Sequence, residues 1–163
     1  MTADPTRAFL RHAIATLAYR GAKILRGAPA GFGDVRAGDP STKTRNAVEI
    51  LAHIGDLLDW TALVVAGEKG WHASPPATWE HEVDRFFAGL RNVDAALAAD
   101  STPSMPLEKI FQGPIADAFT HLGQLALLRR IAGAPVRAEV LVLSEIVVGR
   151  VGPEQASPVR EFD

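Results

Sequence analysis

Two side chains that can bind a metal ion lie one helical turn apart in the C-terminal half of the chain. Asp117 and His121 belong to the segment GPIADAFTHLGQLALLRRI, residues 113–131, whose apolar residues recur at helical spacing. Residues at i and i+4 project from the same side of a helix, with Cβ atoms roughly 6 Å apart. The carboxylate and the imidazole can therefore reach one common point. The same spacing also suits a hydrogen-bonded pair at the edge of a core.

A third candidate ligand, His53, lies in another apolar segment, VEILAHIGDLLDWTALVVAG. If this segment packs beside residues 113–131, two imidazoles and one carboxylate meet. Such a set leaves positions open for water or substrate, as catalytic metal sites do. Zinc, nickel, iron and manganese all accept these ligands, so the ligand types do not select the metal.

Other side chains near these positions are candidates for contacts with a ligand imidazole, a bound water or a cofactor. The polar candidates are Asn46, Glu49 and Gln124. Each of them is equally suited to a solvent-facing position. Trp60 and Trp71 are candidates for the wall of a pocket, although a tryptophan in a helical protein more often packs in the core.

Composition argues against several classes of protein and leaves nucleic-acid binding as a weak alternative. The chain has 163 residues, enough for one domain with a substantial core, and 17 basic against 19 acidic residues give a formal charge of −2. This charge gives no electrostatic reason to expect nucleic acid or an anionic membrane as partner. Cysteine is absent, which removes thiolate ligands and cysteine nucleophiles and fits a cytoplasmic protein. No segment is apolar enough for a transmembrane span.

Helical periodicity appears in four stretches. The predicted helices begin at Pro5, after Ser41 and Thr42, after Thr78, and at Gly113. Ser41, Thr42 and Thr78 are expected to cap helices, and Pro114 is expected in the first helical turn. Glycines at 55 and 123 are expected to allow close helix approach. On the third helix one set of charged residues is predicted to form a solvated face: Glu82, Asp84, Arg85, Arg91 and Asp94.

The leading architecture is an all-α, antiparallel four-helix bundle over residues 1–137, with a long first connection. Residues 138–163 are predicted to form an irregular C-terminal extension packed on the same domain. The run AEVLVLSEIVV in this extension is β-branched and apolar, but a lone strand has nothing to pair with. Glu145 and Arg150 are hypothesised to reach across to the site or to a neighbouring subunit.

The segments TRNAVEILAHIGDLLDW and GPIADAFTHLGQLALLRRIAG resemble the second and last helices of the DinB-like family of metal-binding four-helix bundles. The family pattern has a histidine on the second helix, matched by His53, and an H-x-x-x-H pair on the last. His121, followed by Gly123 and Gln124, matches the end of that pair. Asp117 stands where the family usually has a histidine, which keeps a side chain that can ligate at that place.

The resemblance implies a metalloenzyme with a divalent metal on His53, Asp117 and His121. Some members of the family resemble thiol-dependent transferases that use a low-molecular-weight thiol, and others have no assigned reaction. Thiol-dependent transfer and hydrolysis of a small molecule are the two expected reaction types. The alternative is a non-catalytic bundle in which the same residues bind a structural ion or none. The sequence leaves the substrate, the native metal and the choice between monomer and homodimer open.

Overall fold

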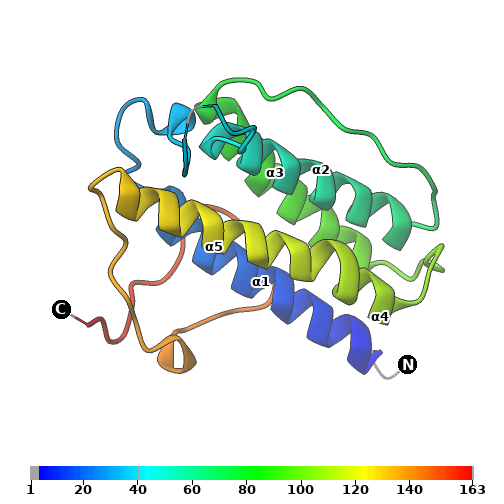
Figure 1. The fold of residues 1–163 in the computed structure, drawn as a ribbon. Coiled ribbons are helices and arrows are strands. Elements are labelled where there is room, and N and C mark those ends of the chain that lie inside the picture. Colours follow the sequence, from blue (N-terminus) through cyan, green and yellow to red (C-terminus); the bar gives the residue numbers. More distant parts are fainter. Residues whose placement is uncertain (1–3, 40, 163) are drawn as a thin grey trace.

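The computed structural model describes residues 4–39 and 41–162, and this part of the chain is all-α (Figure 1). Its long helices lie side by side, and all contribute to one buried apolar core. The helical elements are α1 (Pro5–Leu25), η1 (Phe32–Asp34), α2 (Ala47–Val65), α3 (Trp79–Ala98), α4 (Leu107–Ile110), η2 (Phe111–Ile115), α5 (Ala116–Ile131) and η3 (Leu141–Leu143). Within the described ranges there is no strand, and none of the helices is long and apolar enough to cross a membrane.

Side-chain caps determine where the helices begin. Asp4 accepts a hydrogen bond from the Thr6 N–H at 2.8 Å at the start of α1. The predicted cap at Thr78 is confirmed, because its hydroxyl accepts from the His81 N–H at 3.2 Å. The cap predicted at Ser41 and Thr42 is wrong.

The cap of α2 is Asn46. Its side chain accepts from the Glu49 N–H at 3.0 Å, and the Glu49 carboxylate accepts from the Asn46 N–H at 2.7 Å. This reciprocal capping box satisfies two backbone donors that a helix start leaves free. Ser41 and Thr42 instead bond to Asp39, so they close a turn before the helix.

Helices α2 and α3 run in the same direction, which departs from the predicted antiparallel arrangement. Arg85 contacts Ala52 and Asp56, and Gly89, one turn later on α3, lies against Leu58, further along α2. The connection 66–78 makes this possible, because it runs back along the helices (Figure 1). Extended, it spans roughly 45 Å, more than the roughly 28 Å length of α2.

The helix that carries Asp117 begins earlier than predicted. α4, η2 and α5 follow one another without a break from Leu107, so Pro114 lies inside a helical run. Pro114 has no N–H to donate, and a proline ring clashes with the carbonyl one turn earlier. The segment η2 is a π-helix, and its wider turn accommodates the proline.

Residues 134–162 lie alongside α1 without forming a strand. The Tyr19 hydroxyl donates to Glu139 at 2.8 Å, and the Lys23 ammonium donates to Glu161 at 2.7 Å. Val151 is buried among core residues. Glu145 and Arg150 are 3.5 Å from each other, so the structure pairs these two side chains.

Candidate metal centre

His53, Asp117 and His121 come together between α2 and α5 and form a group that could hold a metal ion. The Nε2 atom of His53 lies 3.7 Å from Asp117 Oδ2, and the Nε2 atom of His121 lies 3.5 Å from Asp117 Oδ1. The ligand atoms of the group all lie within 4.8 Å of one another. Ligands of a tetrahedral zinc ion, at about 2.0 Å from it, lie roughly 3.3 Å apart. Small side-chain shifts therefore bring these three donors to coordination distance.

Gln124 fixes the orientation of the His121 ring. Its Oε1 atom lies 2.8 Å from His121 Nδ1. An amide oxygen only accepts, so this contact places a proton on Nδ1, and in the neutral ring the Nε2 lone pair is then free for a metal. Metal-binding histidines are commonly oriented by this kind of hydrogen bond.

The surroundings of His53 favour its neutral form. Burial lowers the pKa of His53, and the positive charge of Arg45 and the His121 ring lower it further, against the opposing effect of Asp117 and Asp56. A neutral imidazole has the lone pair that a metal requires. The pKa of His53 is therefore displaced in the direction that suits a ligand.

An aromatic pair covers the His53 side of the group. Trp71, in the connection 66–78, packs edge-on against the His53 ring with centroids 6.1 Å apart. Trp60 of α2 packs edge-on against Trp71 at 5.7 Å. Asp117 remains 47% exposed, so the group opens to solvent at its carboxylate.

A pocket of about 360 Å³ adjoins the group at His121. It lies between α5 and the start of α2, with Ile50 and Leu128 among its walls. Its other lining residues are Ala37, Thr44, Arg45, Gln124 and Leu127. The predicted site residue Gln124 is thus both the partner of His121 and part of the pocket wall.

The sequence made Asn46 and Glu49 candidates for contacts with a ligand imidazole, a bound water or a cofactor, but in the structure they cap α2. Both side chains bond to the backbone in the capping box of α2, and the metal group of the described residues does not include Glu49. Gly123, expected to allow close helix approach, has no atom within 4 Å of the position that a Cβ would take. At Gly55 it is a side chain that comes close, since the Arg85 guanidinium lies 3.0 Å from the position that a Cβ would take.

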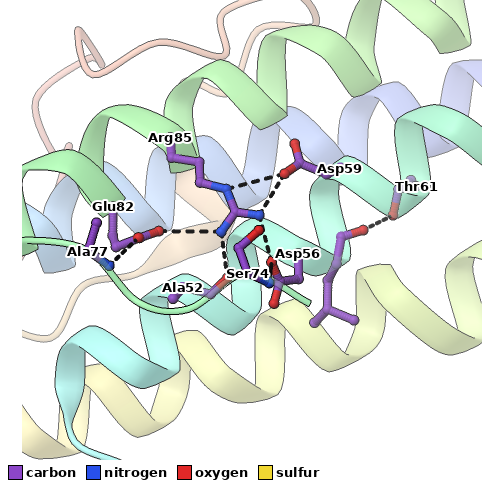
Figure 2. Close-up of polar contacts among 9 residues, drawn as sticks. Ala52, Asp56, Asp59, Thr61, Ser74, Ala77, Glu82 and Arg85 are labelled. Atoms are coloured by element: carbon purple, nitrogen blue, oxygen red, sulfur yellow. Dashed lines mark hydrogen bonds and ion pairs between the residues drawn. The ribbon is translucent and has the colours of Figure 1, made fainter. Parts of the chain in front are cut away.

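A second polar cluster, centred on Arg85, holds the connection that carries Trp71 (Figure 2). Arg85 donates to Asp56 at 2.6 Å and to Asp59 at 2.7 Å, and it lies 3.5 Å from the Glu82 carboxylate. The Ser74 N–H donates to Asp56, and the Ala77 N–H donates to Glu82. Two of the three carboxylates on Arg85, those of Asp56 and Glu82, therefore tether the connection through its backbone.

The burial of several of these side chains overturns the prediction of a solvated face on α3. Glu82 and Asp94 are buried, and Arg85 is partly buried, whereas Asp84 and Arg91 are exposed as expected. Burial by itself lowers the pKa of Arg85, but its hydrogen bonds to Asp56 and Asp59 outweigh this and leave the pKa raised. Charges spaced three residues apart are typical of surfaces, so the sequence carried no signal for this cluster.

Comparisons with known proteins add nothing to these observations, because no protein-family model, curated protein or solved structure matches the chain.

Proposed function

We propose that the chain is a metal-dependent enzyme of the DinB-like kind, built on a four-helix bundle and acting on a small molecule. His53, Asp117 and His121 hold a divalent transition metal in this proposal. The observation that carries it is the convergence of three donor atoms from two helices, all within 4.8 Å of one another. The orientation of His121 by Gln124 and the adjoining pocket support it.

The residues of the chain would divide the work between binding and positioning. The two imidazoles and the Asp117 carboxylate provide three ligands, while Gln124 holds His121 and Trp71 shields His53. A metal bound in such an open site lowers the pKa of a bound thiol or water and polarises a carbonyl. The chain has no cysteine, so a thiolate has to come from a low-molecular-weight thiol. Thiol-dependent transfer and hydrolysis are the two reaction types that follow.

A non-catalytic protein with a structural ion, monomeric or homodimeric, is the alternative. Structural metal sites are closed, with all positions occupied by protein ligands. The exposure of Asp117 and the pocket beside His121 favour the enzyme.

Elemental analysis of protein purified without a metal-affinity tag tests the metal. We expect about one equivalent of a transition metal in the parent and in the His12→Ala control, which removes an exposed histidine of α1. We expect its loss in His121→Ala and Asp117→Ala. A parent protein that contains no metal and binds no added zinc, nickel, iron or manganese would contradict the proposal.

Cobalt substitution separates the enzyme from the structural alternative. If the site is open, adding 2-mercaptoethanol to the cobalt-loaded protein produces a thiolate-to-cobalt absorption band. If the cobalt spectrum does not respond to the thiol, the site is closed and the structural alternative is correct.

A further inference from the structure

The pocket beside His121 has two chemically different parts. Ile50, Leu127 and Leu128 give it an apolar wall, and Arg45 supplies a guanidinium group. Leu127 is 53% exposed, which leaves a large apolar side chain uncovered at this pocket. A volume of about 360 Å³ is within the range of small-molecule sites.

Arg45 has no counter-ion in the part of the chain that the structure describes. Its side chain makes no hydrogen bond and no ion pair with residues 4–39 or 41–162, in contrast to Arg85 and Arg129, which both bond to other residues. It lies close enough to His53 for its charge to lower the pKa of that ring. Arg45 is exposed to solvent and lines the pocket, so its donors are accessible to an anion that enters there.

The charges around the pocket favour such an anion. Two neutral imidazoles, one carboxylate and a divalent metal carry one net positive charge, and Arg45 adds a second. Arg45 also presents a planar fork of donors that fits a carboxylate or a phosphate. The apolar wall next to it suits a carbon chain or ring.

We propose that the pocket binds its substrate as a small amphipathic anion, with the anionic head on Arg45 and the apolar body against Ile50, Leu127 and Leu128. His121 also lines the pocket, so the bound molecule lies beside the proposed metal centre. This inference rests on the proposed function for the identity of the metal centre, but binding to the pocket is measurable without the metal. Arg45 is the specificity-determining residue.

Amide-resolved NMR titration of the full-length protein with hexanoate, hexyl phosphate and the neutral hexanamide tests the inference. The titrations are run on protein as purified and after removal of metal. We expect both anions to shift resonances of residues 45 and 121–128, and Arg45→Gln to weaken their binding roughly tenfold. Whichever of hexanoate and hexyl phosphate binds more tightly shows whether the head group is a carboxylate or a phosphate. Hexanamide is expected to bind the parent no more tightly than the anions bind Arg45→Gln.

Lys43→Gln is the matched control, because Lys43 is an exposed cation on the same connection and is not among the residues that line the pocket. It should leave all three titrations unchanged. Equal binding of hexanoate and hexanamide, or equal anion binding by the parent and Arg45→Gln, overturns the inference.

Zinc titration of the same samples separates the two proposals. If zinc binds but anion binding does not depend on Arg45, the pocket inference fails and the metal centre stands. If anion binding depends on Arg45 while no metal binds, the metal-dependent function fails and the pocket stands.

Discussion

His53 lies in surroundings that act on its charge from several sides. It is largely buried, with 21% of its side chain exposed, and Trp71 packs against its ring. Arg45 is close enough to oppose a positive charge on the ring, while Asp117 favours one. Burial is the largest of these effects and lowers the pKa of His53 below its ordinary value of 6.5. Protonation of His53 is therefore coupled to folding.

The sign of this coupling predicts how stability depends on pH in the metal-free protein. The unfolded chain binds a proton on His53 near pH 6.5, while the folded chain binds it only at lower pH, so the unfolded state holds more protons. The favourable contribution is complete above pH 6.5 and is lost as the pH falls through the folded pKa. We expect the free energy of unfolding in urea to decrease from pH 7.5 to 5.5, and His53→Asn to reduce this decrease.

His12→Asn serves as the control, since His12 is an exposed histidine on α1. It should leave the pH dependence of the parent unchanged. A His53→Asn variant whose unfolding free energy has the same pH dependence as the parent would contradict the coupling.

The positions of side chains on regular helices were the easiest to predict. The spacing of Asp117 and His121 predicted that they share a helix side, and the structure brings His53 to them. Arg45 and Trp71 were harder, because they lie in irregular connections where no periodicity indicates the direction of a side chain. The role of Asn46 was also hard to predict, because an asparagine is suited both to capping a helix and to contacting a ligand in a pocket.

At the scale of helices, the Arg85 cluster links α2 to α3. Two of its carboxylates, Asp56 and Glu82, have side chains only 5% and 2% exposed. Arg85 is the cation that these groups share, and they in turn bond to the backbone of the connection 66–78. Two neighbouring helices that run in the same direction need a long connection that returns from the end of the first to the start of the second. The Arg85 cluster holds the connection 66–78 against α2 and α3.

Removing the cation should therefore destabilise the protein strongly. We expect Arg85→Met to reduce the free energy of unfolding by roughly 3–5 kcal/mol, because it leaves buried carboxylates without a partner. Urea denaturation at pH 7 provides the measurement. Arg91→Met, at an exposed position of the same helix, should change stability by no more than about 0.5 kcal/mol.

Combining Arg85→Met with Asp56→Asn makes the test specific to the ion pair. The double variant should lose less than the sum of the two single variants, since the second change removes one of the charges that the first leaves unpaired. Additive losses would show that Arg85 acts through packing alone.

The order of the helices could be predicted from the sequence, but their directions could not. Apolar periodicity indicated four amphipathic helices, and all four are present. Periodicity shows which side of a helix is buried and not which way its neighbour runs. The parallel pair depends on the path of residues 66–78, and the uninterrupted helix around Pro114 depends on a local π turn.

At the scale of the whole molecule, the C-terminal residues lie along α1, whereas the metal group lies between α2 and α5. Glu139 and Glu161 contact α1 through Tyr19 and Lys23, and Val151 joins the core. These contacts assign the tail to the stability of the helical fold. They do not connect it to the candidate metal ligands.

Deletion of residues 150–163 should separate stability from metal binding. We expect the free energy of unfolding to decrease by roughly 2 kcal/mol or more, because the deletion uncovers the site where Val151 is buried. The zinc stoichiometry of the folded protein should stay the same as in the full chain. Calorimetry and elemental analysis on one sample measure both, and loss of zinc from a folded truncated protein would contradict this division.

The packing of Trp71 against His53 also gives the chain an optical signal for a metal ion that binds at the candidate site. Trp71 and Trp60 form a pair beside the candidate ligands, whereas Trp79 packs against Phe32 at the first connection. Indole emission is quenched by paramagnetic ions at short range and is not quenched in this way by closed-shell zinc. Two of the three tryptophans of this protein can therefore distinguish manganese or nickel from zinc in solution, without any label.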